Sequence, residues 1–348
     1  MARVSLAIVG YGLIGREHVR RAIEEPRARL AAIVEPDPAA AAAASAHGVP
    51  VLASLAELVD RRLAEGVVLA TPTALHAEQA VTCLEAGLPV LVEKPLAHDL
   101  DAGRRIVEAA ARTGVPVLVG HHRRHSPWIR AAKTVIEQGT LGRILLVDAL
   151  TWLAKPEPYF APAWRRRKGA GPVLTNLVHV IDDLRNLVGE IVEVRALASN
   201  ALRGFETEDT AVVLLRFDGG ALGTVSVSDG VAAPWSWEHG SGENPWFPRA
   251  GEACYRIGGT RAALALPGLE LWRHEGDRGW MAPLECLRRT VAEDDPLALE
   301  LRHFCAVVRG EERPVLDAAG GLATLAATLA VLEAADGDTA VRPAGAAA

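Results

Sequence analysis

Three glycines near the start of the chain have the spacing of a loop that binds phosphate. They follow an apolar run, residues 4–9, and open a stretch with helical periodicity. In a Gly-x-Gly-x-x-Gly turn the first glycine allows a tight bend, the second lets a pyrophosphate approach the backbone, and the third lets helix and strand pack closely. The N–H groups of the helix N-terminus then bind the phosphates. The residues expected to contact a dinucleotide here are Gly10, Gly12, Leu13, Ile14 and Gly15.

An acidic residue farther along favours a dinucleotide site over an ordinary glycine-rich turn. Glu35 ends the second apolar run, 20 residues after Gly15, where a carboxylate binds ribose hydroxyls. The same carboxylate would repel a 2′-phosphate, and no arginine follows directly in residues 35–38. The sequence therefore predicts NAD as the cofactor, with NADP disfavoured.

Two further polar segments follow apolar runs, at the strand ends where ligands bind in open α/β sheets. Residues 70–76 read Ala-Thr-Pro-Thr-Ala-Leu-His, and residues 93–95 read Glu-Lys-Pro. Lys94 is a candidate general base, because burial or a nearby positive charge can push a lysine toward neutrality. The alternative is a surface lysine in a turn.

Polar residues interrupt an otherwise apolar helix predicted for residues 173–188. Asn176, His179 and Asp183 follow an i, i+3, i+7 spacing and would share one face of a regular helix. His179 titrates in the range useful for proton transfer, although a lone helical histidine is often structural. This face is the second candidate to contact a reacting oxygen.

The elements that must position these residues alternate over the first third of the chain, as in βαβ units. Near-continuous apolar runs suit parallel strands that helices cover on both faces. Asp99 is placed to cap the last helix. We therefore expect an α/β, doubly wound Rossmann sheet with strands over 4–9, 30–34, 49–52, 66–70, 90–92 and 115–119, and helices over 14–25, 39–46, 55–64, 75–86 and 100–113.

The pattern changes after residue 122, which predicts domains 1–122 and 123–348. Asp218-Gly219-Gly220 predicts a hairpin, and the small residues of 221–228 leave one strand face flat enough to pack against another sheet. We expect helices over 127–138, 173–188, 296–309 and 318–334, and strands over 143–152, 192–199, 210–217, 221–228, 253–257 and 262–266.

Composition excludes several function classes. The 348 residues are 50% hydrophobic and carry a net charge of −6, which excludes a disordered chain and argues against a nucleic-acid partner. Four scattered cysteines form neither a disulfide framework nor a zinc motif. Because no signal pattern and no apolar run of about 20 residues is apparent, we expect a cytoplasmic protein with no membrane partner.

Together these motifs resemble the Gfo/Idh/MocA family of nicotinamide-dependent oxidoreductases, which includes glucose–fructose oxidoreductase and inositol dehydrogenase. The Glu-Lys-Pro at 93–95 is the most specific mark, beside the glycine loop and residues 70–76. Residues 120–127, the Trp-Arg at 164–165 and residues 169–182 resemble later motifs of the family. The resemblance runs from residue 4 to about residue 330.

The resemblance implies an N-terminal dinucleotide-binding domain and a C-terminal α/β domain with an open, mostly antiparallel sheet. That sheet is implied to form a homodimer or homotetramer, and the active site to lie between the domains. Lys94 is implied to act as the acid/base, and His179 to bind the reacting oxygen or relay a proton. Thr71, Thr73 and His76 would line the pyrophosphate and nicotinamide side, and Glu93 would anchor the loop or the nicotinamide ribose.

One position departs from the family pattern. Many polyol dehydrogenases of the family carry aspartate four residues before the histidine, where this chain has Thr175, so an inositol-type substrate is not implied. The basic run at 165–168 is either a solvated loop or, if it faces the pocket, suited to a carboxylate-bearing substrate. The substrate-binding candidates are His122, Arg124, Lys155, Tyr159, Trp164, Arg165, Asn176 and His179.

The leading prediction is an NAD-dependent dehydrogenase acting on a small molecule, a sugar, cyclitol or sugar acid, at a secondary alcohol or ketone. The alternatives are a glycoside hydrolase that recycles bound NAD and a non-catalytic NAD-sensing regulator on the same fold. No metal site is predicted, because no acid or cysteine completes the histidines at 121, 122 and 125. The tryptophan-rich stretch 234–248 is expected either to cover the sheet end as an interface or to close over a substrate.

Overall fold

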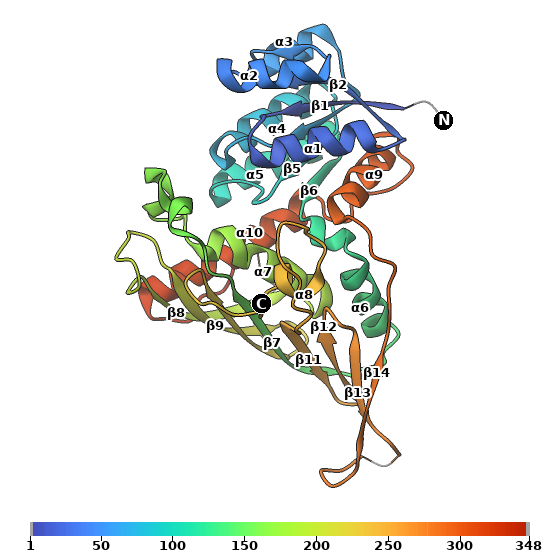
Figure 1. Ribbon diagram of the computed structural model, residues 1–348, viewed down its shortest axis with the longest axis vertical. Helices are drawn as coiled ribbons and strands as arrows, with labels where there is room; N and C mark the ends of the chain where they lie inside the picture. The colour runs from blue at the N-terminus through green and yellow to red at the C-terminus, as the bar shows by residue number, and fades with distance from the viewer. Residues whose placement is uncertain (1–2, 277, 346–348) are drawn as a thin grey trace. The chain divides into compact units, whose positions relative to one another are not determined.

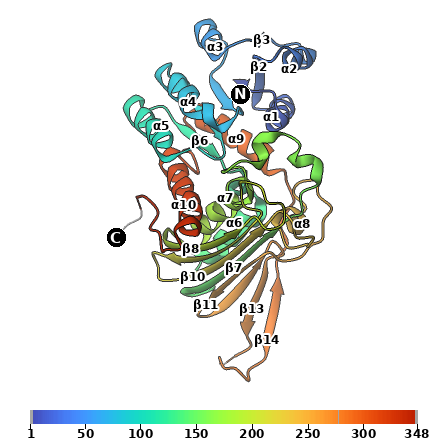
Figure 2. The ribbon, with the colours of Figure 1, turned by 90° about the vertical axis from the view of Figure 1, so that its left-hand side faces the viewer.

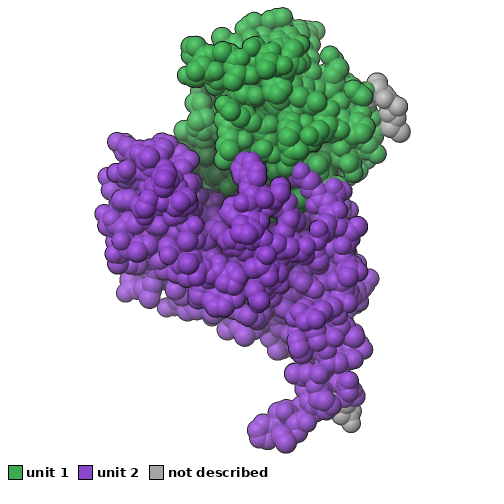
Figure 3. All heavy atoms as spheres, in the orientation of Figure 1, with its two compact units in different colours: residues 1–125, 296–325 green, residues 126–295, 326–348 purple. Residues whose placement is uncertain are grey.

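The computed structural model describes residues 3–276 and 278–345. The chain forms two compact units, coloured separately in Figure 3: residues 1–125 with 296–325, and residues 126–295 with 326–348. The predicted boundary at residue 122 assigns residues 296–325 to the second domain. In the structure these residues belong to the first unit, which includes helix α9 (Pro296–Val308) and the start of α10 (Ala318–Gly337).

The first unit is built on the six-stranded parallel sheet that the apolar runs predict. Its strand order is β3-β2-β1-β4-β5-β6, so the order reverses between β1 and β4, where doubly wound sheets bind their ligands (Figure 1). Every residue of β1 and β4 is buried, which explains why these strands carry no alternating pattern. The strands are β1 (Val4–Val9), β2 (Ala28–Val34), β3 (Val51–Leu52), β4 (Gly66–Leu69), β5 (Val90–Glu93) and β6 (Val117–Gly120).

The helices of this unit lie close to their predicted positions. The Asp99 side chain accepts a hydrogen bond from the Ala102 N–H (2.7 Å), which confirms the predicted cap. The helices are α1 (Leu13–Glu24), α2 (Pro38–Ala44), α3 (Leu55–Arg61), α4 (His76–Glu85) and α5 (Leu100–Thr113), with short turns at η1 (Ser45–His47), η2 (Thr73–Leu75) and η3 (His122–His125).

Helix α9 returns to complete the core of the first unit. It packs against α1 and against η3. Its Leu301, Phe304 and Cys305 are buried in one cluster with Leu6 and Ile8 of β1. The contact is close, since a Cβ on residue 66 of β4 would lie 2.7 Å from the Val308 side chain.

The second unit is built on an eight-stranded sheet of order β14-β13-β12-β11-β7-β10-β9-β8. Only β7 and β10 pair in parallel among these described strands, which confirms an open, mostly antiparallel sheet. The strands are β7 (Ile144–Trp152), β8 (Ile191–Ser199), β9 (Thr210–Phe217), β10 (Leu222–Ser228), β11 (Tyr255–Gly259), β12 (Ala262–Leu266), β13 (Glu270–His274) and β14 (Leu284–Arg288).

One face of this sheet is covered and the other is open. Figure 2 shows α6 (Pro127–Glu137) and α7 (Val178–Leu187) on one face, where Val147, Val213 and Val225 are fully buried. The residues that alternate with them point to the open face, which exposes both apolar and polar side chains over four neighbouring strands. Its large apolar side chains are Leu146, Leu197, Val212, Leu214 and Leu222.

Helix α10 corrects the expectation that no apolar run is long enough to cross a membrane. Among the described residues it is the one helix that is long enough and apolar enough to cross a membrane, with a mean hydropathy of 1.6 over its most apolar stretch. Just over half of that stretch is buried. Ala327, Ala330, Val331 and Ala334 lie in the core of the second unit, so packing explains the apolar composition of this part of the helix.

Candidate active site

The glycine loop of the first unit has the shape of a phosphate cradle. Gly10 has a φ of +94°, and a Cβ there would lie 2.7 Å from the Ala70 carbonyl oxygen. A Cβ on Gly15 would lie 2.1 Å from the Gly10 carbonyl oxygen, so this position also requires glycine. A Cβ on Gly12 would meet no described atom within 4 Å, which leaves room for a pyrophosphate. Helix α1 begins at the next residue, Leu13, with no side-chain cap on its first N–H groups.

Glu35 lies beside this cradle at the end of β2. Its carboxylate accepts hydrogen bonds from the Tyr11 N–H (2.8 Å) and the Asp37 N–H (2.9 Å). Each carboxylate oxygen can accept more than one bond, so Glu35 can still bind the two ribose hydroxyls. The cradle and the carboxylate together fit an adenosine dinucleotide.

Three side chains beside the loop were not predicted from the sequence. The Tyr11 hydroxyl lies 2.7 Å from His47 Nε2, and the Arg16 guanidinium lies 4.9 Å from the centre of the Tyr11 ring. Arg16 also donates to the Tyr11 carbonyl oxygen (3.2 Å). Its position directly after the third glycine is the one sequence signal that could have identified it.

The segment after β4 carries the predicted Thr71, Thr73 and His76. Thr73 lies in the turn η2 and is half-buried, whereas the Thr71 hydroxyl donates to Gln79 Oε1 (2.6 Å). His76 is 1% exposed, and its ring nitrogens contact the backbone oxygens of Pro95 and Thr71. Burial lowers the pKa of His76, although these two carbonyl oxygens oppose the shift. The ring therefore faces protein atoms between two loops.

Glu93 and Lys94 follow β5 at the same edge of the sheet. Glu93 is buried, and it accepts hydrogen bonds from His18 Nε2 (2.7 Å) and from the Lys94 N–H (3.1 Å). Burial alone would raise the pKa of Glu93, but His18, Lys94 and His122 hold it below its ordinary value. Lys94 itself is half-buried. The sequence indicated Glu93 and Lys94 but not His18, which comes from helix α1.

His18, Glu93 and Glu300 are the described residues whose types and positions come nearest to a metal site. Their donor atoms lie within 4.8 Å of one another, and all three are buried. The 2.7 Å contact between His18 and Glu93 is a direct hydrogen bond, so these two side chains are partners of each other.

The turn η3 carries the predicted His122 and Arg124, both half-buried. Burial lowers the pKa of His122 to about 3, with help from the Arg123 charge and against the pull of Glu93. His122 is therefore a neutral hydrogen-bonding group at physiological pH.

This shift predicts a pH dependence of stability. The folded state keeps His122 neutral below its ordinary pKa of 6.5, whereas the unfolded chain takes up a proton there. The contribution of the neutral ring to the free energy of unfolding is fully present above that pH and is lost as the pH falls toward 3. His122→Gln should therefore show a smaller fall in Tm between neutral and acidic buffer than the wild type. The exposed His98→Gln is the control, and equal falls in wild type and His122→Gln would contradict the assignment.

In the second unit, the predicted helix 173–188 has two parts. Val173–Leu177 forms a π-helical turn, and α7 follows from Val178. The wider turn changes the rotation per residue, so the predicted i, i+3, i+7 face does not run regularly from Asn176 through His179. His179 and Asp183 do share a face of α7 and are buried. Asp183 accepts from the Tyr255 hydroxyl (2.8 Å), so it binds the sheet.

A charged cluster surrounds Lys155 beside the π-helical turn. Lys155 Nζ donates to the Thr175 hydroxyl (3.0 Å) and lies 3.6 Å from an Asp229 carboxylate oxygen. Arg203 forms an ion pair with the other oxygen of Asp229. Asp229, which directly follows β10, therefore supplies a carboxylate next to Lys155. Asp229 and Arg203 were not predicted, since they are distant from Lys155 in the chain.

Part of the basic run packs against aromatic rings. The Arg165 guanidinium stacks 3.9 Å from the Tyr159 ring centre and donates to the Tyr159 carbonyl oxygen (2.7 Å). Lys155 lies over the same ring at 4.9 Å. Trp164 is 58% exposed, and Lys168 is an exposed side chain paired with Asp336.

The tryptophan-rich stretch 234–248 contributes partly to the core. Trp237 begins the short helix α8 (Trp237–Ser241) and is buried against Tyr255, with ring centres 5.4 Å apart. Trp235 packs edge-on against Trp152 at 5.2 Å. Trp246 is 58% exposed. A packing role therefore explains Trp237 and Trp235.

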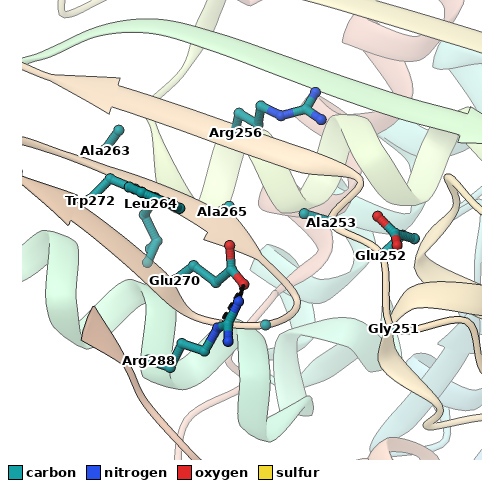
Figure 4. Close-up of a pocket in the computed structure, with 11 residues that line it drawn as sticks. Gly251, Glu252, Ala253, Arg256, Ala263, Leu264, Ala265, Glu270, Trp272 and Arg288 are labelled. Carbon is teal, nitrogen blue, oxygen red and sulfur yellow. Dashed lines mark hydrogen bonds and ion pairs between the residues drawn. The ribbon is translucent and has the colours of Figure 1, made fainter. Parts of the chain in front are cut away.

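A hollow of about 540 Å³ lies over strands β11 to β13 of the second unit (Figure 4). Arg256, Trp272 and the paired Glu270 and Arg288 line it, and none of the predicted site residues does. Arg256 neighbours the inward-facing Tyr255 on β11, so it points to the open face of the sheet. This hollow is a feature of the open face.

Comparison with known proteins identifies relatives of both parts of the chain. Residues 4–121 match the model of an oxidoreductase family with an NAD-binding Rossmann fold, and residues 129–265 match the GFO/IDH/MocA C-terminal domain. The chain is 35% identical to inositol 2-dehydrogenase 2 of Saccharopolyspora erythraea over 64% of this chain and 66% of the relative. It is 30% identical to inositol 2-dehydrogenase of Rubrobacter xylanophilus over 68% of each.

Among solved structures, the chain is similar to the WlbA dehydrogenase from Bordetella pertussis in complex with NADH and UDP-GlcNAcA. The TM-score is 0.79 at 27% identity, over 98% of both chains.

Proposed function

Because the chain belongs to the Gfo/Idh/MocA family of NAD-binding oxidoreductases, we propose that it transfers a hydride between the nicotinamide and a secondary alcohol or ketone. The substrate we propose is a sugar, cyclitol or sugar-acid-like small molecule. The observation that carries the proposal is Lys94, half-buried at the sheet edge that holds the glycine cradle and Glu35. A lysine at this position can exchange a proton with a substrate hydroxyl.

Gly10, Gly12, Gly15 and Glu35 would hold NAD, which when bound would supply the acceptor for the hydride. Lys94 removes the hydroxyl proton as the carbonyl forms, and its ammonium protonates the alkoxide in the reverse direction. The positive charge of an oxidised nicotinamide nearby would favour the neutral amine of Lys94, because like charges repel. We propose that His179 donates a hydrogen bond to the same oxygen and orients it.

The charges around Lys155 support a substrate that carries a carboxylate. Lys155 and Arg165 both contact the Tyr159 ring, and an arginine binds a carboxylate through two parallel hydrogen bonds. The similar WlbA structure holds a nucleotide-linked sugar acid. We therefore propose sugar acids ahead of neutral polyols.

The experiment measures the turnover of each substrate in a panel through the absorbance of NADH. Glucose and glucuronate form a matched pair, since they differ in a hydroxymethyl against a carboxylate, and myo-inositol represents the cyclitols. Faster turnover of glucuronate than of glucose supports the acid preference, and equal turnover removes it. Absence of NADH formation with every alcohol, together with absence of NADH consumption with the corresponding ketones, would count against a dehydrogenase.

We further propose that the protein is a cytoplasmic homodimer or homotetramer that associates through the open face of its sheet. Large apolar side chains are exposed on each of β7, β8, β9 and β10, between polar ones such as Asp148, Thr224 and Arg195. Exposed apolar side chains gathered over several neighbouring strands are typical of a protein–protein interface. No disulfide joins the four cysteines, all of which lie within the described residues, and this suits a reducing compartment.

A charge on this face tests the association. Leu214→Glu places a carboxylate beside the exposed Val212 of the open face, so we expect it to yield monomers by size-exclusion chromatography with light scattering. Ile23→Glu, on an exposed apolar residue of helix α1, is the matched control and should keep the wild-type mass. A multimeric Leu214→Glu protein would argue for another interface.

A further inference from the structure

The backbone that presents Lys94 contacts a buried histidine on each side. Glu93 precedes Lys94, and its carboxylate contacts the His18 ring. Pro95 follows Lys94, and its carbonyl oxygen contacts the His76 ring. We propose that His18 and His76 are positioning residues that together fix the backbone of Lys94. This inference rests on the proposed function, in which Lys94 is the acid/base.

The first contact comes from helix α1. His18 is fully buried, and its Nε2 donates to one carboxylate oxygen of Glu93 at 2.7 Å. The other carboxylate oxygen accepts the backbone N–H of Lys94 at 3.1 Å. The Glu93 carboxylate therefore links α1 directly to the main chain of Lys94. Because both His18 and Glu93 are buried, water does not compete for this hydrogen bond.

The second contact comes from the start of helix α4. His76 Nδ1 lies 3.1 Å from the Pro95 carbonyl oxygen, and Nε2 lies 2.9 Å from the Thr71 carbonyl oxygen. A neutral ring carries one N–H, and the proposal places it on Nδ1, from which it donates to Pro95. The ring lies between the loop after β4 and the loop after β5. Both loops belong to the edge of the sheet that binds the cofactor in this fold. Any shift of Pro95 would move Lys94 with it.

The two histidines use different nitrogens toward the lysine segment. His18 contacts Glu93 through Nε2, whereas His76 contacts Pro95 through Nδ1. The amide nitrogen of glutamine can replace Nε2 and that of asparagine can replace Nδ1, since each amide carries N–H donors. The proposal therefore predicts that glutamine preserves the contact of His18, whereas asparagine preserves the contact of His76. General loss of packing would not produce this crossed pattern.

The variants to compare are His18→Gln, His18→Asn, His76→Asn and His76→Gln in the full chain. A substrate-independent measurement is the rate at which acetic anhydride acetylates Lys94 relative to Lys168, read by mass spectrometry. We expect His18→Gln and His76→Asn to keep the wild-type ratio, and His18→Asn and His76→Gln to change it. With the best substrate of the panel, the latter two should lose at least about 10-fold in kcat, because misplacing a reacting group is costly.

The outcomes separate this inference from the proposed function. Wild-type acetylation ratios in all four variants would overturn the positioning roles, whatever the enzyme turns over. Equal losses in Asn and Gln variants would also overturn them. If the variants of one histidine do not fold, the pair at the other histidine still gives the test. Full turnover by Lys94→Ala would instead reject the proposed acid/base and leave the acetylation result standing.

Discussion

Replacing Lys94 by alanine is expected to lower kcat by about 10²- to 10⁴-fold, the range that positioned acid–base groups contribute. The change removes the group that accepts the hydroxyl proton and leaves the glycine cradle and Glu35 intact. The affinity for NADH should therefore stay close to the wild-type value. Steady-state kinetics with the best substrate of the panel and a fluorescence titration with NADH measure the two quantities separately.

The matched control is Lys168→Ala. Lys168 is an exposed lysine paired with Asp336, and it lies in the basic run that the substrate hypothesis drew on. We expect this variant to keep wild-type kcat and KM. Undiminished turnover by Lys94→Ala would overturn the mechanism, and a similar loss in Lys168→Ala would show that the assay reports nonspecific effects of charge.

Replacing Glu35 by alanine should weaken NAD binding by about 10- to 100-fold, because hydrogen bonds to a charged group are worth about 1.5–3 kcal/mol. NADP binding should weaken less or improve, since the variant no longer repels the 2′-phosphate. The ratio of the two dissociation constants is the measurement. An unchanged ratio would contradict the assignment of Glu35 to the ribose.

The contacts of Glu35 supply a sharper variant. The carboxylate also accepts the Tyr11 and Asp37 N–H groups, so alanine removes loop contacts as well as charge. Glu35→Gln keeps an accepting oxygen and the side-chain length but loses the charge. It should therefore improve NADP binding while costing NAD less than alanine does. Glu57→Gln, on the exposed face of α3, is the control.

The first unit was predictable because its strands are buried on both faces. Such strands appear in a sequence as short apolar runs between amphipathic helices, and all six were found close to their observed positions. Strands β13 and β14 were missed for the opposite reason. Trp272, Arg273 and Leu284 are exposed, and Arg273 pairs with Glu285 across the hairpin, so no apolar alternation marks these strands.

The candidate site also contains some features that the sequence predicts and others that it does not. Gly10, Gly12 and Gly15 act through local backbone geometry, so their spacing carries the signal. The contacts of Glu93 with His18 and of Lys155 with Asp229 join residues more than 70 positions apart, and no local pattern predicts such pairs. The π-helical turn was missed because Val173–Leu177 has the composition of an ordinary helix.

The return of α9 to the first unit has a consequence for synthesis. Leu301, Phe304 and Cys305 fill the core beside β1, so the nascent Rossmann unit lacks part of its interior until the ribosome has added residues 296–325. An emerging chain that ends at residue 125 would leave the apolar partners of these side chains uncovered. Such a fragment is a natural client for a chaperone, and the cofactor unit reaches its final packing only near the end of translation.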